Sequence, residues 1–259
     1  MKQGRSLTDL AHELERRRKA SVDFLSNTRH LMPLVSDGKL QMVVTGQPGY
    51  FPVRTHAARQ IGSYTGIPAV YMERMLTEAP ELAAHNIGHW FQTKGEKRMV
   101  RTLDREIRAF MSDRYRRFDN HQVAEAALPA LIEEERRIGL TISSCEVTES
   151  RLYIKAITPR LQGTVKGQIV QAGLTISNSE VGMGSISVSP FAMVFACLNG
   201  MAFDDNRFKR RHVGRHAEEG EGEEGDVLYA DDTRKADDQA LLLKLRDVIR
   251  AALDEKVFE

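Results

Sequence analysis

Three consecutive runs of alternating apolar and polar residues constrain the fold more than any other feature of the sequence. They are LTISSCEVT (140–148), RLYIKAITP (151–159) and QIVQAGLTISNS (168–179). β-Branched residues with a period of two are typical of strands, and short polar connections join such strands as hairpins. A fourth strand is expected within SISVSPFAMVFACLNGMAF (185–203). These runs predict a meander of three to four strands.

Helices and a hairpin flank the predicted meander. Residues 120–137 place apolar side chains on one helical face, and Gly139 follows as a stop signal. Residues 237–256 also space their leucines for burial on a helix, whereas KRMVRTLDREIRAFMS (97–112) predicts a β-hairpin. Because strands and helices occur in separate runs, the predicted class is α+β with a mainly antiparallel sheet.

The first 93 residues have a different pattern from the rest of the chain. Helical spacing of apolar residues occurs in three segments, 7–26, 54–62 and 68–90, and only 39–46 alternates like a strand. We therefore expect an N-terminal helical region over 1–93 and an α+β core over 94–259. Within that core, residues 217–236 are rich in acids and glycine and predict a mobile acidic loop.

Composition and targeting signals narrow the class of protein. The 259 residues carry a net charge of +1, and 41% hydrophobic with 28% charged residues is typical of a globular chain. Cys145 and Cys197 lie in apolar runs, so we expect buried thiols in a reducing cytoplasm. The charged N-terminus is unlike a signal peptide, and no run of about 20 apolar residues predicts a membrane span.

The sequence lacks the common catalytic and cofactor motifs. It contains no G-x-S-x-G and no P-loop, and GMGS (182–185) precedes a predicted strand and lacks the third glycine of a dinucleotide fingerprint. The pair His85 and His89 lacks the glutamate of a zinc protease motif. We therefore expect no cofactor, no metal and no enzymatic activity. A metal-dependent nuclease is the enzymatic alternative, and its first candidate residues are Asp204, Asp205, His212 and His216.

A basic stretch with interleaved aromatic residues predicts nucleic-acid binding. Residues 94–117 contain nine Lys and Arg residues against four acids. Arginine forks match phosphate oxygens, and aromatic rings stack on bases. In one hairpin register the arginines point outward, and the inward-pointing residues are Met99, Ile107, Ala109 and Met111. The predicted nucleic-acid-binding residues of this stretch are Lys97, Arg98, Arg101, Arg105, Arg108, Arg114, Tyr115, Arg116 and Arg117. The alternative is a solvated face with internal salt bridges.

A second basic cluster precedes the acidic segment. Its predicted nucleic-acid-binding residues are Lys209, Arg210, Arg211 and Arg215. One hypothesis is that the acidic loop shields this cluster when no polyanion is bound. The alternative is that the two oppositely charged segments simply neutralise each other.

The stretch SNSEVGMGS (177–185) joins two predicted strands and allows two interpretations. A hairpin connection explains its glycines, because Gly182 and Gly184 can supply a positive φ or a bulge. Asn178, Ser179 and Glu180 end a strand, where short polar side chains cap backbone groups or meet a neighbouring subunit. Contact of these residues with a ligand stays open.

Four blocks of the sequence together resemble a known family. They are IRAFMSDRYRRFDN (107–120), ISNSEVGMGSISVSPF (176–191), CLNGM (197–201) and RRHVG (210–214). The blocks are similar to the phage- and plasmid-like family catalogued as domain of unknown function 932, over residues 95–256. The resemblance implies a set of signature positions, Asn178, Ser179, Glu180, Gly182, Asn199 and Gly200. The resemblance also implies that the protein is encoded on a mobile element. It implies no activity, because none is assigned to the family.

The predicted order of hairpin, helix, meander and helix is also similar to the core of Redβ/Erf-like single-strand annealing recombinases. Those proteins form rings or filaments without ATP and hold single-stranded DNA in a basic groove, although fold alone does not prove function. Our leading hypothesis is therefore a nucleic-acid-binding protein that binds or anneals single-stranded DNA as a homo-oligomer. The alternative from another class is a protein-binding factor that modulates a host system.

Overall fold

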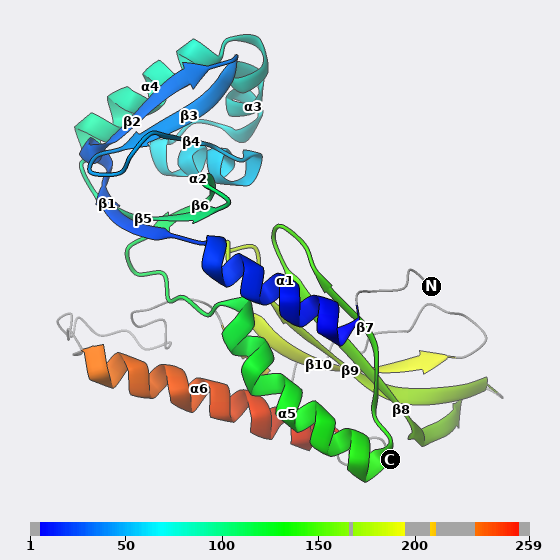
Figure 1. Ribbon diagram of the computed structural model, residues 1–259. Coiled ribbons are helices and arrows are strands. Elements are labelled where there is room, and N and C mark those ends of the chain that lie inside the picture. Colours follow the sequence, from blue (N-terminus) through cyan, green and yellow to red (C-terminus); the bar gives the residue numbers. More distant parts are fainter. Residues whose placement is uncertain (1–5, 166–167, 195–207, 211–230, 254–259) are drawn as a thin grey trace, which may run out of the picture. The chain divides into compact units, whose positions relative to one another are not determined.

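The computed structural model describes residues 6–165, 168–194, 208–210 and 231–253 (Figure 1). The chain divides into two compact units, one of residues 15–115 and one that combines residues 1–14 with residues 116–259. This division differs from the predicted boundary after residue 93. The hairpin of residues 97–112 belongs with the residues before it, because its first strand pairs with a strand near the N-terminus.

The unit of residues 15–115 contains two three-stranded antiparallel sheets. The first has the order β2-β3-β4, with bounds Leu31–Ser36, Lys39–Val44 and Tyr50–Pro52. The second has the order β1-β5-β6, with bounds Asp23–Asn27, Lys97–Leu103 and Glu106–Ser112. Helices α2 (Thr55–Thr65), α3 (Ala69–Glu78) and α4 (Pro80–Lys94) contribute to the same core, in which the rings of Phe91 and Phe110 stack. A short 3-10 turn, Thr28–His30, links β1 to β2.

The predicted hairpin of residues 97–112 is confirmed, with Asp104 and Arg105 at its turn, both at positive φ. The expectation of a helical N-terminal region is only partly right. Helices occur near the predicted segments, but β1, β2 and β4 escaped prediction. These strands are short, and β1 forms beside β5, about seventy positions away along the chain. Strand formation depends on such partners more than on local preference.

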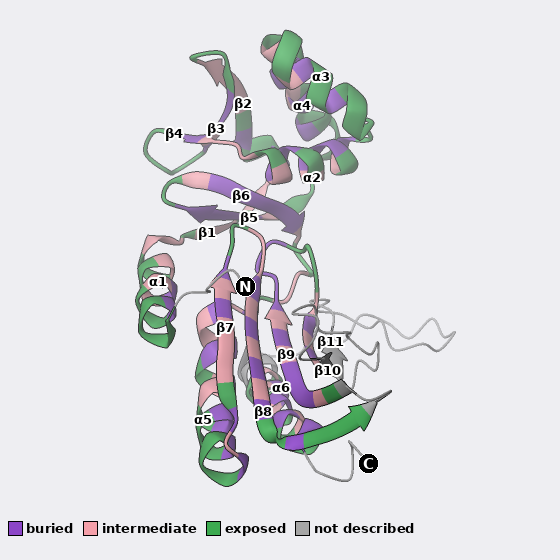
Figure 2. Ribbon diagram, turned by 90° about the vertical axis from the view of Figure 1, so that its right-hand side faces the viewer, coloured by how far each residue is buried: buried purple, intermediate pink, exposed green. Residues whose placement is uncertain are grey.

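The second unit is built on one five-stranded antiparallel sheet with the order β11-β10-β9-β8-β7, which confirms the predicted meander. The strands are β7 (Thr141–Val147), β8 (Leu152–Val165), β9 (Gln168–Asn178), β10 (Ile186–Val194) and β11 (Phe208–Arg210). Helices α5 (Asn120–Ile138) and α6 (Asp231–Ala252) pack on one face of this sheet (Figure 2). Together the two units confirm the α+β class.

The core of this unit lies between the sheet and its helices. Alternate strand residues such as Ile154, Leu174 and Val188 are buried, and they meet the apolar faces of α5 and α6. Helix α1 (Leu7–Ala20) adds Leu10 and Leu14 to the same cluster. Of the predicted acidic loop, residues 231–236 belong to α6, and residues 217–230 lie outside the described residues.

Gly173 occupies a position of β9 that has no room for a side chain. A Cβ atom there would lie 2.5 Å from the Phe191 ring and 2.7 Å from the carbonyl oxygen of Ala156. We expect Gly173→Ala to lower the free energy of unfolding by about 1–3 kcal/mol, because the backbone of β8 cannot move away from the added methyl group without disturbing the sheet. The measurement is urea unfolding followed by circular dichroism.

Gly163 of β8 is the matched control, because a Cβ atom added at that position would have no neighbouring atom within 4 Å. Gly163→Ala should leave the stability unchanged or raise it by up to about 1 kcal/mol. Equal effects of the two substitutions would contradict the packing argument at Gly173.

Candidate functional site on the five-stranded sheet

Two of the predicted nucleic-acid-binding arginines are buried. Arg101 is 1% exposed and donates from Nε to both carboxylate oxygens of Asp23, at 3.2 and 3.1 Å. Arg108 is 2% exposed and lies 3.5 Å from the hydroxyl of Ser21. The expectation that the hairpin arginines all point outward is wrong for these two residues. The segment that leads into β1, and β1 itself, supply their partners, so neither residue is placed to meet a phosphate at the surface.

The other residues of the predicted stretch differ in their contacts and in their exposure. Arg98 lies over the Tyr64 ring and bonds Glu96 at 2.5 Å, and Arg105 donates to the carbonyl oxygen of Pro48 at 2.9 Å. Lys97, Arg105, Arg114 and Arg117 are exposed, and Tyr115 is half-buried. The alternative of internal salt bridges therefore describes part of this stretch.

Arg116 forms ion pairs with Asp237 and Asp238 of α6. It also lies over the ring of Phe118, which is buried. Two acidic residues therefore do meet a predicted binding arginine, but these ion pairs connect Arg116 to α6 within the same unit. Of the second basic cluster, Lys209 and Arg210 lie on β11, and Arg211 and Arg215 lie outside the described residues.

The Asn-Ser-Glu block after β9 holds the start of α5. Asn178 is 1% exposed, and its Nδ2 donates to the carbonyl oxygen of Phe118 and to Oδ1 of Asn120, both at 2.9 Å. Glu180 is 7% exposed and accepts the backbone N–H of Asn120 at 2.6 Å. A carboxylate at a helix N-terminus satisfies an open N–H group and complements the helix dipole. The predicted capping role of this block is thus present, and it acts on a helix about sixty positions away.

The rest of the same stretch forms a tight turn. The Ser179 hydroxyl donates to the carbonyl oxygen of Ser150 at 2.8 Å and accepts the N–H of Met183 at 3.0 Å. Gly182 has φ 77°, as expected for a glycine in such a turn, whereas Gly184 has no positive φ. The hairpin interpretation therefore explains Gly182 without a ligand, whereas the backbone of Gly184 does not require a glycine.

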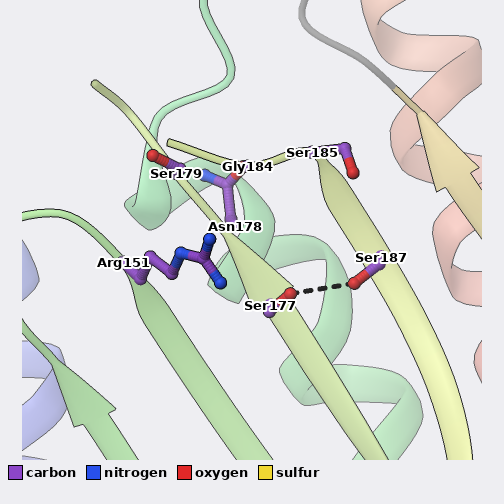
Figure 3. A pocket seen from close by; sticks show the side chains of 7 residues that line it. All are labelled: Arg151, Ser177, Asn178, Ser179, Gly184, Ser185 and Ser187. Atoms are coloured by element: carbon purple, nitrogen blue, oxygen red, sulfur yellow. Dashed lines mark hydrogen bonds between the residues drawn. The ribbon is translucent and has the colours of Figure 1, made fainter. Parts of the chain in front are cut away.

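A pocket of about 210 Å³ opens beside this turn (Figure 3). Arg151 and four serines, Ser177, Ser179, Ser185 and Ser187, line it together with Asn178 and Gly184. Arg151 precedes β8, while the serines come from β9, from β10 and from the turn between them. Sequence reasoning did not select Arg151, because a single arginine between two strands carries no motif.

The sheet face opposite α5 and α6 carries polar side chains in register across three strands. One row contains Tyr153, Ser177 and Ser187, and the next contains Lys155, Thr175 and Ser189. All six side chains are half-buried, and the Lys155 ammonium lies 4.6 Å from the centre of the Phe191 ring. None of the described helices of this unit covers this face (Figure 2). We call these six residues the open face.

The sequence comparison assigns a family to most of this second unit. The family model described as "Domain of unknown function (DUF932)" matches residues 109–251, which is more than half of the chain. The chain belongs to the DUF932 family. The predicted resemblance to that family is therefore confirmed, and the matched residues include α5, the meander and most of α6.

The DUF932 match includes the Asn-Ser-Glu block, the pocket and the open face. Asn199 and Gly200, the other signature positions, lie outside the described residues. No curated protein and no solved structure is significantly similar to the chain, so the likeness to annealing recombinases stays a prediction.

The described part of this DUF932 protein lacks the side-chain clusters that hold metal ions. Among the described residues, no group of three or more His, Cys, Asp and Glu side chains could hold a metal ion. Asp204, Asp205, His212 and His216 lie outside those residues. Of the helices in the described ranges, none is long and apolar enough to cross a membrane. Cys145 is buried, as predicted, and Cys197 lies outside the described part of the chain.

Proposed function

We propose that this chain is a nucleic-acid-binding protein that holds a single strand on its open face. The observation that supports the proposal is the combination of a tyrosine, a lysine and four hydroxyl side chains in register on a sheet surface, which no described helix of the same unit covers. Sheet surfaces of this kind bind single strands in other protein folds, with aromatic rings stacked on bases. Double-stranded nucleic acid instead presents its bases at the bottom of grooves.

The proposed contacts follow from the chemistry of the open face. Tyr153 supplies a ring for stacking, and Lys155 supplies a positive charge for a phosphate. The hydroxyl of Thr175 can donate to phosphate or sugar oxygens without regard to base sequence. Binding of this type needs no ATP, which agrees with the lack of a P-loop in the sequence. Lys97, Arg114 and Arg117 are exposed in their own segments, and they stay predicted phosphate contacts independently of the open face.

We expect the purified protein to bind a fluorescent oligonucleotide of deoxythymidines at low salt and to lose affinity as salt rises. Lys155→Ala should lower the slope of log K against log[salt] by about 1, since one phosphate contact is lost. Tyr153→Leu should weaken binding by about 1–3 kcal/mol through the loss of stacking. Fluorescence anisotropy over a salt series measures both effects.

Lys244→Ala is the matched control, because Lys244 is an exposed lysine on α6, which packs on the opposite side of the sheet. This variant should bind as the wild type does. The proposal would be contradicted if the folded wild-type protein bound no DNA or RNA oligonucleotide at low salt. The same preparations test annealing of complementary strands and, by light scattering, the proposed homo-oligomer.

A further inference from the structure

The pocket shares Ser177 and Ser187 with the open face, and it has the donor groups of an anion-binding site. Its wall residues contribute one guanidinium and several hydroxyls, and no carboxylate of the described residues lines it. Arginine matches the oxygens of phosphate with parallel N–H groups, and such charge-assisted hydrogen bonds are stronger than neutral ones. The charge and hydrogen-bonding character of the lining therefore favours a phosphate group over a neutral ligand.

The guanidinium of Arg151 is held in a defined orientation. Its Nη1 donates to the hydroxyl of Tyr153 at 3.0 Å, and its Nη2 donates to the carbonyl oxygen of Met183 at 2.6 Å. These two bonds use two of the five N–H groups that a guanidinium offers, so others stay available to a ligand. Figure 3 shows the guanidinium extending from the start of β8 toward Ser177. A side chain that is already ordered loses less entropy when a ligand binds.

The serines next to Arg151 add a second donor. The hydroxyls of Ser177 and Ser187 are 2.8 Å apart and share a hydrogen bond (Figure 3). Only one of the two hydroxyl hydrogens is used in that bond, so the other can be donated to an anion. Ser179 does not add to this set, because its hydroxyl donates to the carbonyl oxygen of Ser150.

We propose that this pocket is a phosphate-binding subsite, with Arg151 as its cation and the Ser177–Ser187 pair as its hydroxyl donor. The inference deepens the proposed function and rests on it in one respect, namely that the phosphate belongs to the backbone of a bound single strand. Tyr153 connects the two sites, because its hydroxyl orients Arg151 while its ring belongs to the open face. The same chemistry would accept free phosphate or a nucleotide.

Arg151→Gln should weaken oligonucleotide binding about tenfold or more and lower the salt slope by about 1, since a charge-assisted phosphate contact is lost. Ser187→Ala should weaken binding a few-fold. It also provides a second readout should the Arg151 variant fail to fold. Arg136→Gln is the matched control, because Arg136 is an exposed arginine on α5 and should leave binding unchanged. Inorganic phosphate is titrated in parallel by calorimetry, with wild type and variants.

The outcomes separate the subsite from the proposed function. If the wild type binds strands and neither variant alters affinity or salt slope, the subsite is overturned while the function stands. If the wild type binds no strand but binds inorganic phosphate with loss in Arg151→Gln or Ser187→Ala, the subsite stands with free phosphate or nucleotide as its ligand. If neither ligand binds the folded wild type, both proposals are overturned.

Discussion

Replacing Asp23 with alanine should lower the free energy of unfolding by about 3–5 kcal/mol, because it leaves the charge of a buried arginine without its carboxylate. The side chain of Arg101 is 1% exposed and that of Asp23 is 11% exposed, and their closest N–O distance is 3.1 Å. A buried charge without its partner is more costly than the intact pair is favourable. Guanidinium chloride unfolding measures the effect.

Two further variants sharpen the test of this pair. Lys97→Ala changes an exposed residue on the same strand, β5, and should alter stability by less than about 0.5 kcal/mol. The double variant Asp23→Leu with Arg101→Met replaces both charges by apolar groups and should recover much of the loss. A loss below about 1 kcal/mol for Asp23→Ala would show that the ion pair contributes little. Any effect of Arg101 variants on nucleic-acid binding must be judged against this change in stability.

The substitution Glu180→Ala should destabilise the protein by about 2–3 kcal/mol, because it removes a charged acceptor from a buried N–H at a helix start. The contact joins the Glu180 carboxylate to the N–H of Asn120, across sixty positions of the chain. Glu180→Gln keeps an acceptor and loses the charge, so we expect a smaller loss of about 1 kcal/mol. Thermal and urea unfolding measure both variants.

Glu125→Ala is the control for the Glu180 variants, since Glu125 is an exposed residue of α5. It should change the stability by less than about 0.5 kcal/mol. Were Glu180 mainly a ligand-binding residue, Glu180→Ala would reduce oligonucleotide binding and leave stability intact. That result would contradict the capping role.

The Asn-Ser-Glu block shows how far a signature can be interpreted without a structure. Its position after a strand and its residue types indicated caps for backbone groups. The helix that receives the cap was not predictable, because the residues concerned lie far apart in the sequence. The pocket could not be predicted from the sequence either, because Arg151 and the serines come from separate segments of the chain.

For the basic hairpin, the sequence predicted the secondary structure but not the burial of the side chains. The hairpin itself was predicted from the sequence, and the structure places its turn at Asp104 and Arg105. The exposure of its arginines could not be predicted in the same way. Alternation shows that a strand has two faces, but it does not show which residues cover each face. Arg101 is buried because β1 pairs beside β5 and brings Asp23 to it.

By itself, the sequence determined the elements whose signals are local. The meander of β7 to β10 and the helix α5 follow from side-chain periods of two and of 3.6 within short windows. Tertiary structure alone decided which polar groups meet, namely Arg101 with Asp23, Glu180 with Asn120, and Arg151 with the serines of the pocket. The physical reason is that burial and charge pairing depend on distances between residues far apart in the chain, and no local pattern records those distances.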